Sequence, residues 1–219
     1  TVPNTGRINA SNPCSEYMFL NNTSCNLASI NLLKFRKPKK GFDVEGFRYA
    51  TRMLSSAMEM LVYFSGYPTD KIKQMSRDFR TLGIGYANLG ALLMAEGLPY
   101  DSNAGRNYAA AITALLSGES YAQSARIASF LGPFAFYKQN EEPMMKVMNM
   151  HRYHAYEISD QGMPADLLKA ARRSWDVAAK EGERYGFRNA QISVLAPTGT
   201  IAFFMDCDTT GVEPAIALV

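Results

Sequence analysis

The sequence has few of the residues that mark several large classes of protein. It contains three cysteines in 219 residues, an odd and sparse count that argues against a disulfide-stabilised secreted domain. It lacks the run of about 20 apolar residues that a membrane span needs, and no basic-then-apolar signal peptide opens it. The net charge is only +3, so a nucleic-acid surface is not indicated. We therefore expect a cytoplasmic protein that binds neither membrane nor nucleic acid.

The composition that remains is that of a globular protein. Hydrophobic side chains make up 47% of the residues and charged ones 20%, which is enough apolar surface for a packed core. The chain begins at Thr1 without a methionine and ends in the apolar run 215–219. These two ends predict that the sequence is a piece of a longer polypeptide.

Helices dominate the expected secondary structure. Five segments combine a residue that favours a helix start with apolar residues at helical spacing. In the longest of them, Gly118 is expected to interrupt or bend the helix, and Gly132-Pro133 ends it. The first helix has its apolar positions at Phe47, Met53, Leu54, Met58, Leu61 and Val62. The segments start at Asp43, at Pro68-Thr69, at Asp101 (to about Leu131), at Glu141 (to Ile158) and at Pro164 (to Glu183).

A few short segments favour strands instead. The first 30 or so residues are rich in Asn, Ser, Thr and Pro, which indicates a loop that runs into the apolar stretch 27–35. Residues 81–91 alternate small and large side chains, as in a strand or a tightly packed helix, and 191–196 form a β-prone run. The pattern predicts an α/β protein that is mostly helical.

A thiol, an amide and a carboxylate lie close together near the start of the chain, in Asn12-Pro13-Cys14-Ser15-Glu16. In an extended backbone, residues 12, 14 and 16 share one face, and a proline at 13 favours that conformation for the residue before it. An amide can hold a hydroxyl, a carboxylate can take its proton, and a thiol can do nucleophilic or redox work. A second thiol, Cys25, follows eleven residues later.

Other interpretations of these cysteines stay open on residue types alone. The segment can be a polar loop with two incidental buried cysteines, because buried cysteine is common. A Cys-His nucleophile needs an imidazole nearby, and the only histidines are His151 and His154, spaced as in a helix. That pair lacks accompanying ligands for a metal, so a solvated helix face is favoured over a metal site.

The turn Pro197-Thr198-Gly199-Thr200 lies between the β-prone run and a second apolar stretch, 201–205. Unpaired backbone N–H groups, a glycine and two hydroxyls at a helix start suit a phosphate. The turn is not a Walker motif, because no lysine follows the glycine. A helix cap without any ligand uses the same residues, and the polar turn 208–214 either lines the same pocket or closes a loop.

Taken together, these segments resemble the catalytic subunit of ribonucleotide reductase. The Asn-Pro-Cys-Ser-Glu wording and the short gap to the second cysteine are most similar to the class II, adenosylcobalamin-dependent branch. The motifs occur in the family's order and span the chain. They are Asn12 to Tyr17, Ser24 to Asn31 (Ser-Cys-Asn-Leu-Ala-Ser-Ile-Asn), Leu82 to Asn88 (Leu-Gly-Ile-Gly-Tyr-Ala-Asn), Leu195 to Thr200 and Gly211 to Pro214.

The resemblance implies a role for each site residue. Cys14 would lie at the tip of the family's finger loop and become a thiyl radical that abstracts the 3′ hydrogen of the ribose. Glu16 would be the general base on the 3′ hydroxyl, Asn12 would hydrogen-bond the ribose hydroxyls, and Cys25 would be one half of the redox pair. Cys207 does not match the partner cysteine's setting and is interpreted as structural or incidental. The implied substrate-binding residues are Asn12, Cys14, Ser15, Glu16, Pro197, Thr198, Gly199, Thr200 and Ile201.

The resemblance also implies the fold and its subdivision. The chain would be part of a ten-stranded α/β barrel, mostly helical within this piece and carrying the finger loop. Residues 1–35 would hold the finger loop and the redox cysteine, 42–185 would be mainly helical, and 190–219 would hold the phosphate loop and strand region. The second redox cysteine would precede this chain, and the cysteines that pass on electrons from thioredoxin would follow it.

The implied activity is reduction of ribonucleotides, expected as diphosphates, to 2′-deoxyribonucleotides within a larger enzyme, with this piece inactive alone. The implied cofactor is adenosylcobalamin, and the implied partners are a thioredoxin-type reductant, allosteric nucleotides and a second subunit in a homodimer. Two alternatives remain: the class I large subunit, which receives its radical from a separate metal-bearing subunit, and a non-catalytic nucleotide-binding fragment.

Overall fold

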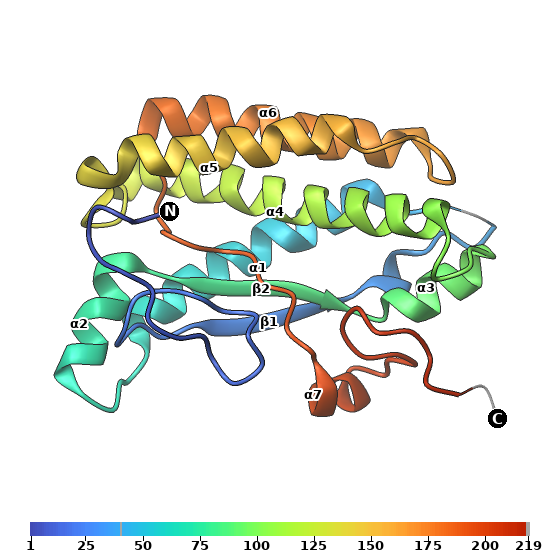
Figure 1. Ribbon diagram of the computed structural model, residues 1–219, viewed down its shortest axis with the longest axis horizontal. Helices are drawn as coiled ribbons and strands as arrows, with labels where there is room; N and C mark the ends of the chain where they lie inside the picture. The colour runs from blue at the N-terminus through green and yellow to red at the C-terminus, as the bar shows by residue number, and fades with distance from the viewer. Residues whose placement is uncertain (40, 218–219) are drawn as a thin grey trace.

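A layer of helices covers one side of a parallel strand pair, and irregular segments occupy the other (Figure 1). The computed structural model describes residues 1–39 and 41–217. Residues 218–219, which end both the C-terminal apolar run and the predicted strand region 190–219, lie outside the described residues. The helical layer consists of α4 (Asn103–Leu131), α5 (Tyr137–Glu157) and α6 (Ala165–Tyr185). The N-terminal segment starts beside α5, where Asn4 contacts Asn140, and then continues to the opposite side of the strands, where α7 (Gly199–Phe204) also lies.

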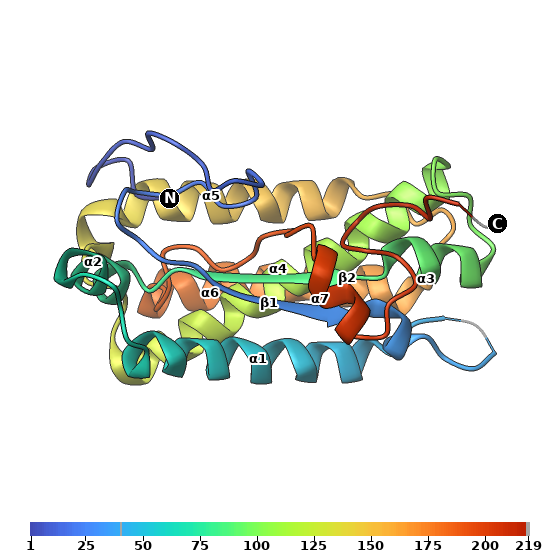
Figure 2. The same cartoon turned by 90° about the horizontal axis from the view of Figure 1, so that it is seen from below.

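The two strands are β1 (Asn26–Asn31) and β2 (Leu82–Ala87), which pair in parallel with Asn26 opposite Leu82. The connection between them runs through the 3-10 helix η1 (Leu32–Phe35), α1 (Val44–Phe64) and α2 (Asp70–Phe79). Parallel strands need such a helical crossover. Seen from below, α1 and α5 flank the strand pair (Figure 2). The short α3 (Leu89–Glu96) follows β2.

The predicted β-prone run 191–196 forms less sheet than expected. Its backbone accepts from and donates to β2, with N–H···O distances of 2.8 to 3.0 Å, but it makes only one parallel bridge, between Ser193 and Ile84. Among the described residues the sheet therefore has two strands and does not close into a barrel.

The alternation of small and large residues in β2 has a clear basis. Leu82, Ile84 and Tyr86 are fully buried in the core. On the alternate positions, a side chain at Gly83 would strike the Cys25 sulfur, and one at Gly85 would strike the carbonyl oxygen of Val194. Residues 82–87 thus form a strand rather than a helix, and its glycines leave room for neighbouring segments.

Most predicted helix starts are confirmed by their caps. The carboxylate of Asp43 accepts from the N–H of Gly46 at 3.1 Å, and the Thr69 hydroxyl accepts from the N–H of Ile72 at 3.2 Å. Such caps satisfy backbone donors that a helix start leaves unpaired. Two starts differ, because α4 begins at Asn103 with Ser102 as its cap rather than at Asp101, and α5 begins at Tyr137 rather than at Glu141.

The expected interruption at Gly118 is not seen, because α4 is continuous from Asn103 to Leu131. The glycine instead permits close packing between α4 and α6. A Cβ atom there would lie 3.0 Å from the backbone nitrogen of Trp175, whose side chain is buried in the core. The loss of helix propensity at a glycine is thus offset by helix–helix contact.

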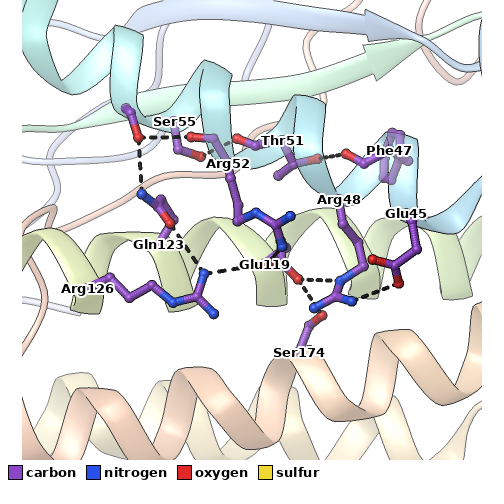
Figure 3. Close-up of polar contacts among 11 residues, drawn as sticks. Glu45, Phe47, Arg48, Thr51, Arg52, Ser55, Glu119, Gln123, Arg126 and Ser174 are labelled. Carbon is purple, nitrogen blue, oxygen red and sulfur yellow. Dashed lines mark hydrogen bonds and ion pairs between the residues drawn. The ribbon is translucent and has the colours of Figure 1, made fainter.

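A buried carboxylate joins three helices (Figure 3). Glu119 on α4 has a side chain that is 1% exposed, and it pairs with Arg48 and Arg52 of α1 at 2.9 Å each. The hydroxyl of Ser174 on α6 donates to it at 2.9 Å. Burial alone would raise the pKa of Glu119, but the hydrogen bonds and charges of the arginines outweigh it and lower the pKa. The charge is therefore kept within the helical layer.

In the part of the chain that the structure describes, none of the helices has both the length and the hydrophobicity to cross a membrane.

Candidate functional site

The segment that carries Asn12, Cys14 and Glu16 is a hairpin, so the prediction of an extended backbone with one shared face is wrong. An antiparallel bridge closes it between Ser11 and Met18. Within it, the N–H of Ser15 donates to the carbonyl of Asn12 at 3.1 Å, and Ser15 has a left-handed φ of 64°. Pro13 takes the second position of this turn, where proline is favoured. The turn leaves Cys14 exposed at the hairpin tip.

The amide of Asn12 is partly committed inside the hairpin. Its Oδ1 accepts from the N–H of Tyr17 at 3.0 Å, and the backbone N–H of Asn12 donates to the Tyr17 carbonyl at 3.1 Å. Among the described residues, Asn12 Nδ2 makes no hydrogen bond. That group is the part of the side chain that can donate to a ligand.

The base of the hairpin is tied to both strands. The buried hydroxyl of Tyr17 donates to Thr81 Oγ1 at 2.9 Å, just before β2. Thr81 Oγ1 in turn donates to the carbonyl of Ser24 at 2.5 Å, next to Cys25. These bonds fix the hairpin relative to the second thiol.

Cys25 lies half-buried against β2. A Cβ atom at Gly83 would be 2.5 Å from its sulfur, so only glycine leaves room for the thiol there. Burial, with a smaller contribution from the Glu16 carboxylate, raises the pKa of Cys25 to about 12. The thiol is therefore protonated at neutral pH and is close enough to Glu16 to feel its charge.

Glu16 has an oxygen with no partner. The side chain is half-buried, and its Oε2 is shielded from solvent without a hydrogen bond to any described residue. A buried polar atom in a native protein is almost always paired. This oxygen is a natural acceptor for a ligand hydroxyl.

The predicted turn 197–201 overlaps the start of α7, because Thr198 is the residue before that helix and residues 199–201 are its first three residues. Thr198 is buried, has a left-handed φ of 55°, and donates its hydroxyl to the carbonyl of Ala196 at 2.9 Å. Gly199, Thr200 and Ile201 are exposed. Of the two threonine hydroxyls in the turn, that of Thr200 is the one open to a ligand.

The sequence reasoning missed Ser29, which links the two parts of the site. Its hydroxyl lies 3.3 Å from the hydroxyl of Thr198. Ser29 follows Cys25 by four residues, so both face the same side of β1, roughly 13 Å apart along an extended strand. The two-residue period of side chains along a strand was the sequence signal that could have identified Ser29.

The hairpin segment and α7 lie on the same side of the strand pair (Figure 1). Glu16 lies near Cys25, just before the start of β1, and Thr198 in the turn 197–201 contacts Ser29 of that strand. No hydrogen bond joins residues 11–18 to 197–201 among those that the structure describes.

The remaining candidate residues lie elsewhere. His151 stacks on Trp175 with ring centroids 5.2 Å apart, and both histidines are exposed on α5. Cys207 donates weakly to the carbonyl of Met205 at 3.9 Å, and burial together with Asp208 and Asp206 raises its pKa. Within residues 1–39 and 41–217, no three His, Cys, Asp or Glu side chains are placed to hold a metal ion.

Comparison with known proteins gives a consistent result. A model of the family "ribonucleotide reductase, barrel domain" matches residues 1–219. Over the whole chain, the sequence is 58% identical to a vitamin B12-dependent ribonucleotide reductase of Rhodopirellula baltica, covering 21% of that protein. It is 50% identical to the Streptomyces coelicolor protein of the same name, covering 23%, and 46% identical to that of Agrobacterium fabrum, covering 18%. The chain thus spans about a fifth of the length of these curated relatives.

Proposed function

The chain belongs to the ribonucleotide reductase barrel-domain family, and on this premise we propose that it forms the thiol-bearing part of an adenosylcobalamin-dependent enzyme that reduces ribonucleotides. Relatives that are 46 to 58% identical over the whole chain are vitamin B12-dependent ribonucleotide reductases, which supports this cofactor class. Because the chain spans only about a fifth of the length of these relatives, we assign the activity to a larger polypeptide that contains it.

Cys14 is the proposed radical residue. As a thiyl radical its sulfur takes the hydrogen atom from ribose C3′, which restores the S–H bond and leaves a carbon radical on the substrate. Its exposed place at the hairpin tip supports this role, because both a bulky cofactor and a sugar can reach it. Adenosylcobalamin, when bound, supplies the radical chemistry that converts the thiol.

Glu16 is the proposed base on the 3′ hydroxyl of the same ribose, and the unpartnered Oε2 is the observation that supports it. Asn12 donates from Nδ2 to a ribose hydroxyl, since its Oδ1 is held by the hairpin. Ser15 completes the turn that holds both against the sugar.

Cys25 is proposed to deliver reducing equivalents. Together with a second thiol from outside this chain, it gives two hydrogen atoms as the C2′–OH bond breaks, so that water and a disulfide form and C2′ gains hydrogen. The high pKa of Cys25 supports this role because the thiol keeps its proton until it is used. A thioredoxin-type protein then reduces the disulfide.

Residues 197–201 are proposed to hold the substrate phosphates. The exposed backbone at Gly199 and Thr200 and the Thr200 hydroxyl are the donors. Thr198 contributes by shaping the turn rather than by its hydroxyl, which bonds within the protein.

We further propose that the strand pair and its helices are part of a ten-stranded α/β barrel in the complete enzyme. The proposed substrate is a ribonucleoside diphosphate. Allosteric nucleotides are proposed to regulate the enzyme, and two copies are proposed to form a homodimer. The reaction takes place in the cytoplasm.

The single observation that carries the proposal is the hairpin that exposes Cys14 at its tip and holds Glu16 close enough to Cys25 to raise the pKa of that thiol. The test is deoxyribonucleotide formation by the complete enzyme from a ribonucleoside diphosphate, with a dithiol reductant, with and without adenosylcobalamin. Turnover that requires the cofactor is expected, and the 219 residues alone should give none. Turnover without cobalamin would indicate the class I alternative. Nucleotide binding with no turnover in its presence would indicate a non-catalytic module.

A further inference from the structure

Two asparagines meet at the ends of the two strands. Asn31 is the last residue of β1, and Asn88 follows β2. Asn88 Nδ2 donates to Asn31 Oδ1 at 3.0 Å. Both residues are buried, with Asn88 0% exposed and Asn31 9% exposed. Both belong to the motifs singled out in the sequence, yet neither has a role in the chemistry above.

The asparagine pair grips the backbone that follows α7. Asn88 Oδ1 accepts from the N–H groups of Asp208 and Thr209, each at 3.0 Å. Asn31 Nδ2 donates to the carbonyl of Met205 at 3.1 Å. Two side chains therefore hold segment 205–209 at three points.

The held segment leads directly into the back of the phosphate turn. A Cβ atom at Gly211 would lie 2.7 Å from the carbonyl oxygen of Pro197 and 2.9 Å from that of Ala196. Asp206 and Thr198 both have left-handed φ angles, 58° and 55°, which non-glycine residues adopt only when their surroundings impose it. The conformation of the turn thus depends on the segment behind it.

We propose that Asn31 and Asn88 are positioning residues for the phosphate-binding turn 197–201, an inference that rests on the proposed function of that turn. They hold 205–209, whose extension to Gly211 supports the turn from behind, so the turn is already ordered when a nucleotide arrives. Asparagine suits position 88 for two reasons. It tolerates the left-handed φ of 72° there, and its amide both accepts and donates.

The proposal predicts a change in KM rather than in kcat. A preformed site binds without the entropy cost of ordering a loop, whereas the radical chemistry at Cys14 makes no contact with the pair. In the complete enzyme, Asn88→Gly keeps the backbone angle and removes the amide. We expect KM for a ribonucleoside diphosphate to rise at least about tenfold, as expected from loss of two or more buried hydrogen bonds, with kcat within about threefold of the parent.

A milder variant guards against misfolding. Asn31→Ala removes the donation to the Met205 carbonyl and leaves Asn88 Oδ1 on the N–H groups of Asp208 and Thr209. We expect it to raise KM less than Asn88→Gly. Amide hydrogen exchange over 205–211 should be faster in both variants than in the parent.

Asn189 provides a matched control at the other end of β2. It is 1% exposed, donates to Glu59 Oε2 at 2.6 Å and to the carbonyl of Arg80 at 2.8 Å, and makes no contact with the turn. Asn189→Ala should lower thermal stability without raising KM.

The outcomes separate this inference from the proposed function. A parent that reduces ribonucleotides, with a folded Asn88→Gly variant whose KM is unchanged, overturns the positioning role alone. An equal rise in KM in Asn189→Ala also overturns it, because the effect is then general loss of stability. A parent that binds no ribonucleotide overturns the proposed function and this inference with it.

Discussion

The buried carboxylate of Glu119 and the half-buried carboxylate of Glu16 differ in how many hydrogen-bond and ion-pair partners the protein gives them. Glu119, inside the helical layer, pairs with three arginines and accepts a hydrogen bond from a serine hydroxyl. Glu16, in the hairpin beneath the strands, keeps one shielded oxygen without a partner among the described residues. The same chemical group is satisfied by the protein in the first region and left available in the second.

The difference separates groups that hold the fold from groups that await a ligand. A buried charge with several protein partners links the elements that carry those partners, as Glu119 links α1, α4 and α6 (Figure 3). A shielded but unpaired atom costs stability unless something binds there. Mutations in the hairpin should therefore change the rate of the reaction with little effect on stability, and mutations around Glu119 should lower stability.

The largest effect is expected at the hairpin tip. In the complete enzyme, Cys14→Ser should lower deoxyribonucleotide formation by at least about 10³-fold, as removal of a reacting group does. Because Cys14 is exposed, the unfolding midpoint should stay near that of the parent. Cys207→Ser changes a thiol without a proposed role and should leave turnover near the parent level. Substantial turnover by Cys14→Ser would refute the thiyl assignment.

Glu119→Ala should show the reverse profile. Removing this carboxylate takes away the partner of Arg52 and leaves Arg48 with only the exposed Glu45, which should cost about 3–5 kcal/mol of unfolding free energy. Urea unfolding measures this loss. Glu45→Ala is the control, because Glu45 pairs with the same Arg48 but is 75% exposed and should cost less than about 1 kcal/mol. Equal costs for the two variants would contradict the distinction.

Glu16→Gln should reduce turnover on the order of 10²-fold if Glu16 is the base. It keeps the size of the side chain, and since Oε2 has no partner in the described protein, stability should change little. The measurement is kcat together with the unfolding midpoint of the complete enzyme. An unchanged kcat removes the base role, and a large loss of stability would mean that Glu16 serves the fold as Glu119 does.

A smaller effect is expected in thiol reactivity. Because burial raises the pKa of Cys25 to about 12, little thiolate is present at pH 8, and iodoacetamide should label it at least about tenfold more slowly than the exposed Cys14. Mass spectrometry of peptides from a time course gives both rates in one sample. Glu16→Gln should speed labelling of Cys25 slightly, because the carboxylate contributes to the raised pKa. Equal labelling rates would show that the second thiol is not enclosed.

The helices were predictable because their signals are local. Asp43, Thr69 and Pro164 each begin a helix where the sequence indicates. Burial was less predictable, since Met53 and Leu61 share the apolar spacing of α1 yet are 53% and 52% exposed. Periodicity defines a helix face but does not say how much of it another element covers.

The motifs gave the candidate site residues, but the arrangement of those residues in space was not predictable. The turn at Cys14 depends on the left-handed Ser15 and on the distant bond from Tyr17 to Thr81, which no local pattern reveals. The partners of Asn88 likewise come from a segment far along the chain. The family resemblance supplied proposed roles, and only the three-dimensional contacts gave the supports.

The packing of the Cys25 thiol against Gly83 also affects the order in which the protein folds. The two residues are separated by all of α1 and α2, so the thiol is enclosed only after a long crossover brings two parallel strands together. Contacts of high sequence separation form slowly, whereas neighbouring helices such as α5 and α6 make local contacts that form early. We therefore expect Cys25 to remain open to alkylation during early refolding, after most helical signal has returned. The enclosure of the second thiol would then report the late assembly of the strand pair.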